Sequence, residues 1–395
     1  MSLCPVCGSE NSIDVFKENG RPRYALQRHT SRQSALQCDK ENVHFVFCVD
    51  CQFTYNKNFD PSVMDYQEDI ESSRKYSEYF NNYIISVCKQ VNDVFSVRKK
   101  TIVEIGCGDG QFLIELRKLF KYEGYGFDPS LIRSNRVPHY KDLKFVPDNY
   151  NSDYLNKKPD LIVLRHILEH IADPNDFLTP IICNQEVHPS GIYVEVPDWE
   201  WIVDNDQVMM FSNDHCSYYS KNSLELALSL CGFKCEQLSV TFEDEYLQYF
   251  GKEISLNDTP ESLKYNRGLH LKGYSGTDLN SKTKSFIRRI PKVLERFKSY
   301  FSGTSNDAVL YGAGGKGTIL LSTLGISYEQ LPFVVDSNPN KHNTYIPVTG
   351  QQIIPPDHLK IIRPRYVLIT NPSYYIEIAS QLDSLGVKAQ IITIK

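Results

Sequence analysis

The spacing of hydrophobic and polar residues changes several times along the chain. Residues 1 to about 60 show no regular period and predict a loop-rich region, whereas apolar and aromatic side chains between 62 and 97 recur at helical steps. From 100 to 245 short apolar runs alternate with helical stretches, which is typical of a parallel sheet in an α/β fold. A second alternation of this kind begins at Ala308 and continues to the end of the chain.

The two alternating regions predict individual strands and helices. In the first region we expect strands at Thr101–Ile105, Gly124–Phe127, Leu143–Val146, Leu161–Leu164, Gly191–Val196 and Cys235–Phe242. Helices are expected at Gln111–Phe120, after a glycine turn, and at Lys221–Cys231, which Gly232 would cap. In the second region the expected strands are Ala308–Tyr311, Phe333–Val335, Tyr366–Thr370 and Gln390–Ile394.

The pattern divides the chain into four segments. They are an N-terminal domain at 1–60, a central domain with a helical lead-in at 61–250, a helical connector at 251–304 and a smaller C-terminal domain at 305–395. A chain of 395 residues is too long for one ordinary core. The predicted fold class is α/β, with a central doubly wound Rossmann-like domain and a smaller Rossmann-like C-terminal domain.

Composition and charge narrow the class of protein. Hydrophobic residues make up 41% of the chain and charged residues 23%, as in a globular protein and unlike a disordered one. The net charge of −5 disfavours a broad nucleic-acid-binding face. No apolar run approaches the roughly 18 residues of a membrane span, so none is expected. The N-terminus lacks the features of a signal peptide, and we expect a cytoplasmic location, where cysteines are thiols or metal ligands.

The segment 104–110 places three glycines between a predicted strand and a predicted helix. Gly106, Gly108 and Gly110 remove Cβ atoms, so the loop can bend sharply and a ligand can approach its backbone. Glu104 and Asp109 are unsuited to cradling a phosphate. They suit a cationic ligand, such as a sulfonium compound that also carries an ammonium group.

A further acid completes this candidate cofactor site. Asp128 ends the second expected strand, where a carboxylate can accept hydrogen bonds from ribose hydroxyls. The loop E-x-G-x-G-x-G followed by this acid resembles the class I S-adenosylmethionine-dependent methyltransferases over roughly residues 100–245. The resemblance implies that the three glycines line the methionine part of the cofactor and that Asp128 binds its ribose. Asp148 is a candidate for the adenine edge, with an ordinary surface carboxylate as the alternative.

Cysteines near the N-terminus form two C-x-x-C pairs. Cys4 and Cys7 make the first pair, and Cys48 and Cys51 make the second. Two such pairs can surround one tetrahedral Zn²⁺ ion, and four thiolates leave no position for a reacting water. The sequence therefore predicts a structural zinc site, against the alternatives of a redox dithiol or of a ligand set that includes Cys38 or His44.

Histidines after the fourth and fifth expected strands are candidates for proton transfer. A methyltransferase orients two reactants and, where needed, removes a proton, and histidine is the usual base at neutral pH. His215 stands directly after Asp214, which could hold its ring and stabilise its charged form. His166 and His170 follow the fourth expected strand, where capping or core packing is the alternative role.

The order of these motifs resembles a narrower family. Glu195-Val196-Pro197-Asp198, then Asp214-His215, then a tyrosine and a helix ending Cys231-Gly232-Phe233 is similar to the sugar C-methyltransferases of deoxysugar pathways. These enzymes combine a zinc-binding N-terminal domain, a methyltransferase core and a Rossmann-like C-terminal domain. The resemblance implies that His215 removes a proton next to the ketone of a nucleotide-linked sugar, with His170 or His166 close to the sugar. The resulting enolate carbon would attack the methyl group.

A second glycine-rich loop, at 312–317, matches the dinucleotide pattern G-x-G-x-x-G, and Asp336 ends the next expected strand. Alone, this loop predicts an NAD-dependent oxidoreductase, but the domain after 305 is short and has no clear hydride-transfer machinery. The family comparison implies instead that Gly312, Gly314 and Lys316 hold the diphosphate of the substrate, and a purely structural turn is a further interpretation.

The leading hypothesis is therefore C-methylation of a nucleotide-linked keto-deoxysugar, a small-molecule substrate, with S-adenosylmethionine as cofactor and zinc as a structural ion. O- or N-methylation of a sugar or another metabolite is the runner-up. An oxidoreductase and a non-catalytic zinc-dependent scaffold are the hypotheses from other classes.

Overall fold

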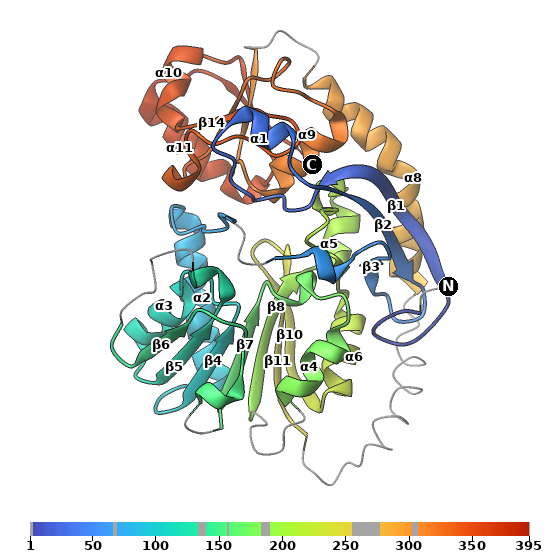
Figure 1. Ribbon diagram of the computed structural model, residues 1–395, viewed down its shortest axis with the longest axis vertical. Coiled ribbons are helices and arrows are strands. Elements are labelled where there is room, and N and C mark those ends of the chain that lie inside the picture. The colour runs from blue at the N-terminus through green and yellow to red at the C-terminus, as the bar shows by residue number, and fades with distance from the viewer. Residues whose placement is uncertain are drawn as a thin grey trace.

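The computed structural model describes residues 3–65, 69–132, 140–155, 158–182, 190–254, 277–301 and 307–394. The expected connector at 251–304 lies partly outside these ranges. Among the described residues, no helix is long and apolar enough to cross a membrane. Figure 1 shows a central α/β unit below, a smaller α/β unit above, and the N-terminal strands alongside both.

The central unit is built on a seven-stranded sheet with the strand order β10-β11-β8-β7-β4-β5-β6. Its strands are β4 (Thr101–Ile105), β5 (Glu123–Phe127), β6 (Leu143–Val146), β7 (Leu161–Arg165), β8 (Gly191–Pro197), β10 (Phe233–Thr241) and β11 (Tyr246–Glu253). Strands β4 to β8 pair in parallel, whereas β11 pairs antiparallel with both β8 and β10. The sheet is therefore mixed, and the expectation of a parallel sheet holds for five of its strands.

Helices cover both faces of this sheet. They are α2 (Glu78–Phe95), α3 (Gln111–Leu119), α4 (Pro174–Ile182) and α6 (Lys221–Leu230). Side chains of β7 alternate between two cores: Leu161 and Val163 pack with α2 and α3, while Ile162 and Leu164 pack with α4 and α6. This alternation is the reason why β7 is an unbroken apolar run.

The C-terminal unit is a five-stranded parallel sheet with the order β14-β13-β12-β15-β16. Its strands are β12 (Ala308–Tyr311), β13 (Phe333–Val335), β14 (Gln352–Ile354), β15 (Tyr366–Ile369) and β16 (Gln390–Thr393). Its helices are α9 (Gly315–Leu324), α10 (Leu359–Ile362) and α11 (Tyr375–Leu385). The expected strands of this region are confirmed to within one residue.

The N-terminal region contains a sheet, which corrects the expectation of a loop-rich segment. Strands β1 (Ser12–Pro22), β2 (Lys40–Cys48) and β3 (Thr54–Asn56) pair antiparallel, and α1 (Arg32–Leu36) lies between the first two. The fourth strand, β9 (Ser217–Tyr218), comes from the central region and pairs with β3. The N-terminal sheet is thus completed by the segment that directly follows His215.

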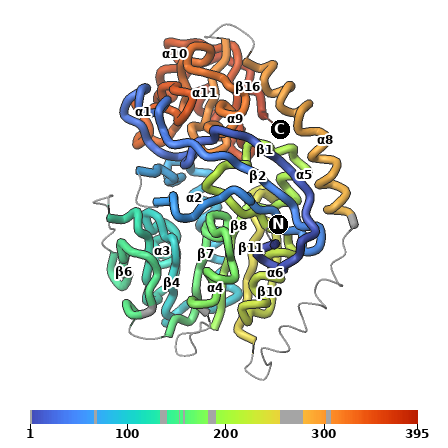
Figure 2. The backbone as a smooth tube through the Cα atoms, turned by 45° about the vertical axis from the view of Figure 1, so that its right-hand side comes forward, coloured from blue at the N-terminus to red at the C-terminus, as the bar shows by residue number. Residues whose placement is uncertain are grey.

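One hydrophobic core joins the three regions. It includes Phe45 of β2, Trp199 of α5 (Trp199–Asp204), Phe286 of α8 (Thr277–Ser299) and Leu310 of β12. Figure 2 shows α8 running beside the C-terminal unit, with β1 and β2 crossing in front. The shared core fixes the central and C-terminal units relative to each other.

One predicted helix begins later than expected, and one strand of the central sheet was not predicted. The helix expected from residue 62 begins only at Glu78, where the Ser77 side chain accepts a hydrogen bond from the backbone N–H of Phe80. Strand β11 was not predicted, and it crosses the expected boundary at residue 250. The domain boundaries themselves remain predictions.

Candidate functional site

Two cavities open at the carboxyl ends of the parallel strands of the central and C-terminal sheets. The first, here called the central cavity, has a volume of about 490 Å³ and is lined by the loop after β4, by Asp128 after β5 and by Asp148 beyond β6. The second, the inter-lobe cavity, has a volume of about 300 Å³ and is lined by the loop after β12 and by Asp336 after β13. In each sheet the first strand has its next strand on one side and a later strand on the other: β5 and β7 flank β4, and β13 and β15 flank β12. Ligands of open α/β sheets bind where the strand order reverses in this way.

The two cavities meet at a common boundary. Arg74, His166, Asp214 and His215 line both cavities, and we call these four residues the junction. They come from three segments that lie far apart in the sequence. A ligand in one cavity can therefore meet a ligand in the other beside these side chains.

The glycine loop after β4 has the geometry that its sequence predicts. Gly106, Gly108 and Gly110 have φ values of +71°, +55° and +77°, in the left-handed region that favours glycine. A Cβ on Gly106 would lie 1.9 Å from Cδ1 of Ile167, whereas at Gly108 it would meet nothing within 4 Å. The loop is thus tightly packed on one side and open on the other.

Glu104 is a buried carboxylate beneath this loop. Its side chain is 2% exposed, its Oε2 atom has no hydrogen-bond partner among the described residues, and it lines the central cavity. Burial raises the pKa of Glu104 from 4.5 to about 8. A carboxyl group of this kind has the chemistry to pair with a cationic ligand in the cavity.

The other predicted cofactor acids are placed differently from one another. Asp128 accepts hydrogen bonds from the backbone N–H groups of Gly108 at 2.7 Å and Ser130 at 2.9 Å, which ties β5 to the glycine loop. Asp109 turns toward Lys75, 3.2 Å away, and accepts a hydrogen bond from Ser73. Asp148 is exposed at the rim of the central cavity.

His166 directly follows β7 and is held between two buried carboxylates. Its Nε2 lies 2.9 Å from Glu195 Oε1, and its Nδ1 lies 3.3 Å from Glu169 Oε1. Burial alone would lower the pKa of His166, but the two carboxylates outweigh this effect and raise it. The residue has a φ of +55°, which costs free energy in a non-glycine residue and is common at functional sites.

His215 and His170 pack against each other at the junction. Their ring centroids are 4.7 Å apart with the planes nearly perpendicular, and a ring nitrogen of His170 bonds to the backbone oxygen of Asp214 at 2.7 Å. Ligand atoms of Glu169, His170 and His215 all lie within 4.8 Å of one another. Burial and the charge of His170 lower the pKa of His215 from 6.5 to about 4.

Asp214 and His215 line the same cavities, but the carboxylate of Asp214 makes no hydrogen bond to the ring of His215 in the described part of the chain. Oδ1 of Asp214 is buried and has no hydrogen-bond partner in the described part of the chain. His215 is therefore held by packing on His170 and by its backbone N–H, which donates to Ser212 Oγ at 3.3 Å.

Two family models match the chain. Residues 79–238 match a methyltransferase domain, and residues 276–393 match a C-methyltransferase C-terminal domain. The protein is an S-adenosylmethionine-dependent methyltransferase. No curated protein sequence matches the chain.

The solved structures that are similar to part of this methyltransferase are distant from it. The pyocyanin biosynthetic protein PhzM is 13% identical over 44% of this chain and 55% of its own, with a TM-score of 0.33. Magnesium protoporphyrin IX methyltransferase from Synechocystis is 13% identical over 44% of this chain and 84% of its own, with a TM-score of 0.33. The plantazolicin methyltransferase BpumL is 12% identical over 45% and 84%, with a TM-score of 0.36.

The central cavity of the methyltransferase fits a positively charged cofactor. Its orphaned Glu104 carboxylate can pair with a cationic group, and the open side of Gly108 lets a ligand approach the backbone. When bound, S-adenosylmethionine supplies an electrophilic methyl group. The residues of the junction line this cavity as well as the inter-lobe cavity.

Around the second glycine loop of the methyltransferase, the lysines are already paired with acidic side chains. Lys316 pairs with the buried Glu245 at 2.8 Å and lies over the ring of Trp201. Lys341 is also buried, and its Nζ lies 3.3 Å from Asp336 Oδ2 and donates to the backbone oxygen of Ala313. Asp336, which a dinucleotide ribose would need, is thus already paired with a cation.

Gly312 and Gly314 lie beside open space in this second loop. A Cβ on Gly312 would approach only Thr370 Oγ1, at 3.8 Å, and one on Gly314 would meet nothing within 4 Å. Helix α9 begins at Gly315 without a side-chain cap, so no side chain of the cap residue accepts from its first N–H groups, and Gly314 and Gly315 line the inter-lobe cavity.

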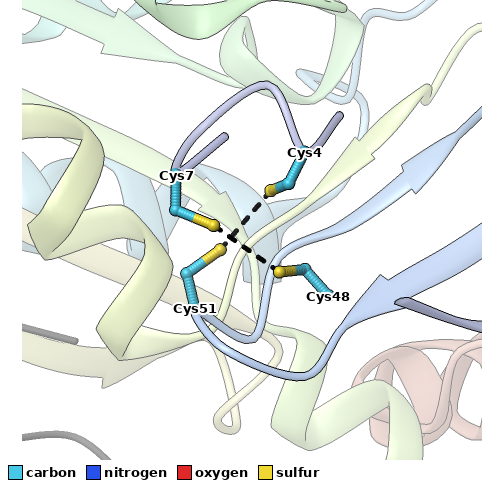
Figure 3. A group of neighbouring side chains, drawn as sticks. All are labelled: Cys4, Cys7, Cys48 and Cys51. Carbon is cyan, nitrogen blue, oxygen red and sulfur yellow. Dashed lines mark hydrogen bonds between the residues drawn. The ribbon is translucent and has the colours of Figure 1, made fainter. Parts of the chain in front are cut away.

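The four cysteines of the N-terminal pairs converge on one point, as Figure 3 shows. The Sγ atoms of Cys4 and Cys51 are 3.5 Å apart, those of Cys7 and Cys48 are 3.6 Å apart, and all four lie within 4.8 Å of one another. Four thiolates at Zn–S distances of about 2.3 Å would be separated by about 3.8 Å. The cluster therefore fits a tetrahedral ion, while Cys38 and His44 do not belong to it.

Several residues of the site escaped prediction. Arg74, Glu169, Glu245 and Tyr246 line the cavities, but none of them belongs to a motif with a fixed spacing. Glu169 lies between the two predicted residues His166 and His170, and this position is the one sequence signal that could have indicated it.

Proposed function

We propose that this methyltransferase transfers a methyl group to carbon, next to the ketone of a nucleotide-linked keto-deoxysugar. The observation that carries the proposal is the junction, where a neutral imidazole stands between a cavity for a charged cofactor and a second cavity between the lobes. The match of residues 276–393 to a C-methyltransferase C-terminal domain supports transfer to carbon.

His215 is the proposed base. Its lowered pKa keeps the ring neutral at physiological pH, so that one ring nitrogen can accept a proton. His215 would take the proton from the carbon beside the ketone, and the electron pair of that C–H bond would move onto the carbonyl oxygen as an enolate. The enolate carbon then forms the new C–C bond while the methyl–sulfur bond breaks and its electron pair remains on sulfur.

His166 is proposed to lie close to the sugar as a positive charge. Its raised pKa favours the imidazolium form, and this charge would stabilise the developing enolate, because both ring N–H groups already face carboxylates. Glu195 and Glu169 hold the ring in place. Glu195 in turn accepts hydrogen bonds from Tyr193 at 2.7 Å and from Arg165 at 2.9 Å, so the position of His166 is fixed from behind.

The nucleotide part of the substrate is proposed to lie on the second glycine loop. Backbone N–H groups at the start of α9 suit the diphosphate, and Lys316 can leave Glu245 to meet it. An NAD cofactor is disfavoured there because Lys341 already pairs with the acid that would bind its ribose. Zn²⁺ is proposed to be held by the four N-terminal cysteines, as a structural ion.

Solvent-deuterium exchange tests the proposal. The enzyme is incubated in D₂O with a panel of nucleotide-linked keto-deoxysugars and S-adenosylhomocysteine, so that deprotonation can occur without methyl transfer. We expect deuterium at the carbon beside the ketone and its loss in His215→Ala. His44→Ala is the matched control, because His44 lies on the N-terminal sheet and contacts Asp14. Methylated product without exchange would indicate O- or N-methylation instead.

A further inference from the structure

Arg74 lies at the junction and has no carboxylate partner. Among the residues that the structure describes, no carboxylate oxygen lies within the 4.0 Å of an ion pair from its guanidinium. Two other arginines differ in this respect, because Arg21 lies 3.1 Å from Glu18 and Arg165 lies 2.9 Å from Glu195. Arg74 therefore brings a guanidinium without a directly paired carboxylate to the boundary of the two cavities.

Two contacts from different elements hold this side chain. Its Nη1 donates a hydrogen bond to the hydroxyl oxygen of Tyr246 at 2.7 Å, at the start of β11. The guanidinium also lies over the ring of Phe80 in α2, with 4.8 Å between its central carbon and the ring centroid. Tyr246 is itself fixed, since its ring packs edge-on against His166 at 4.7 Å. The guanidinium is thus positioned before any ligand binds.

The hydroxyl of Tyr246 adds a second donor. Because its oxygen accepts the hydrogen bond from Arg74, its own proton must point to another acceptor, and the described residues supply none. Tyr246 lines the inter-lobe cavity beside Arg74. Two hydrogen-bond donors, one of them charged, therefore meet at the same place.

A partly buried guanidinium whose N–H groups are not paired with a carboxylate can gain free energy by pairing with the anion of a ligand. The planar guanidinium suits oxygen anions in particular, since its N–H groups match the geometry of a carboxylate. Donors fixed in advance around a developing oxyanion also lower the barrier of a reaction, because no reorganisation is needed when the charge appears.

We propose that Arg74 and Tyr246 form an oxyanion-binding site at the junction. The oxyanion could come from the cofactor, as the carboxylate of its methionine part, or from the substrate, as the enolate oxygen that forms when His215 removes the proton. The second source rests on the proposed function, whereas the first does not. In both cases the pair binds a reactant directly.

The test uses three substitutions in the full-length enzyme. Arg74→Met keeps the aliphatic stem on Phe80 and removes the charge, Arg74→Lys keeps the charge without the planar fork, and Tyr246→Phe removes the hydroxyl alone. Arg117→Met is the control, because Arg117 pairs with Asp142 away from both cavities. Thermal unfolding shows whether each variant is folded.

Two measurements distinguish the sources of the oxyanion. Calorimetry compares S-adenosylhomocysteine with 5′-methylthioadenosine, which lacks the carboxylate. If the oxyanion is the carboxylate of the cofactor, Arg74→Met should bind S-adenosylhomocysteine about tenfold to 100-fold more weakly. Its affinity for 5′-methylthioadenosine should not change. If the oxyanion is the enolate of the substrate, Arg74→Met should keep its affinity for the cofactor and exchange deuterium about 100-fold more slowly. Arg74→Lys should recover part of this rate.

Unchanged affinity and unchanged exchange in folded Arg74→Met and Tyr246→Phe would overturn the proposal. If none of the keto-sugars takes up deuterium with the unmodified enzyme, the proposed function fails. The calorimetric comparison then tests by itself whether Arg74 binds the carboxylate of the cofactor.

Discussion

The two glycine loops of this methyltransferase have similar backbones and opposite electrostatics. Each follows the first strand of a parallel sheet, opens a helix that has no side-chain cap, and is tied to an acid at the end of the next strand, Asp128 or Asp336. The central loop leaves the carboxylate of Glu104 unpaired, whereas the C-terminal loop has its acids paired with Lys316 and Lys341. A glycine pattern therefore indicates where a ligand can approach, and the charges around it decide which ligand.

The largest effect is expected from removing the proposed zinc ion of the N-terminal lobe, because this lobe contacts both units that carry the glycine loops. The N-terminal lobe contacts the C-terminal unit through Arg28 and Arg32, which donate to backbone oxygens of Asn340 and Gly350, and it contacts the central unit through Pro5 and Asn175. Structural zinc contributes on the order of 10 kcal/mol to the folding of small zinc-stabilised domains.

Cys48→Ser should therefore lower the zinc content measured by elemental mass spectrometry, lower the unfolding temperature and abolish methyl transfer. Cys38→Ser is the control, because this thiol lies outside the cluster. Full activity in zinc-free enzyme would show that the lobe does not need the ion.

The second prediction compares one glycine from each loop. Gly106→Ala places a side chain at φ +71° and 1.9 Å from Ile167, whereas Gly314→Ala has φ −87° and open space. A strained residue costs on the order of 1–3 kcal/mol, so Gly106→Ala should weaken S-adenosylmethionine binding by about 100-fold. Gly314→Ala should leave this affinity within about twofold and raise the KM of the nucleotide substrate. Calorimetry and steady-state kinetics measure both, and equal losses of cofactor affinity would remove the distinction between the loops.

The third prediction concerns the pH dependence of cofactor binding. The pKa of Glu104 is raised to about 8 in the protein, so below that pH its proton must leave when a cation binds. The affinity for S-adenosylmethionine should then rise by about tenfold between pH 6 and pH 7 and level off above about pH 8. Without the cofactor, the raised pKa makes the folded state lose stability as the pH rises from 4.5 to about 8.

Glu104→Gln should bind the cofactor weakly and with little dependence on pH. Calorimetry in buffers of different ionisation enthalpy counts the protons released on binding. A pH dependence that survives in Glu104→Gln would assign the proton to another group.

The smallest effect is expected at the C-terminal loop. Lys316→Gln removes the cation that is proposed to meet the diphosphate, and a hydrogen bond to a charged group contributes about 1.5–3 kcal/mol. Part of this is offset because Lys316 gives up Glu245 to bind the substrate, so we expect the KM of the nucleotide-sugar to rise about fivefold. Cofactor affinity should not change. A loss of cofactor affinity instead would place Lys316 at the wrong cavity.

Most of the α/β framework could be predicted because its strands are short apolar runs buried on both faces. The strands β4 and β6 were predicted at their observed ends, and β12 and β13 likewise. The strands β1 and β11 could not be predicted. The register of β1 shifts twice, between Asp14 and Phe16 and between Glu18 and Arg21, which breaks its alternation. β11 is nearly all buried, so it shows no alternation either.

The candidate site was predictable only where one segment carries it. The glycine loop and the C-x-x-C pairs are local, and their spacing indicates their geometry. The junction is not local, because Arg74, His166 and His215 meet only through the packing of three separate segments. Charge compensation is hidden for the same reason: Lys316 and Glu245 are far apart in the sequence, so their ion pair could not be foreseen.

The short strand β9 has a consequence for how distant sites influence each other. Ser217 and Tyr218 pair with Tyr55 and Thr54, three residues or more beyond Cys51, and begin two residues after His215. The proposed ion among the cysteines and the proposed sugar beside His215 would thus order two ends of one hydrogen-bonded ladder. By thermodynamic reciprocity, if bound metal raises the affinity for the sugar by a given factor, bound sugar must raise the affinity for the metal by the same factor. Saturating substrate should accordingly protect the ion from a competing chelator.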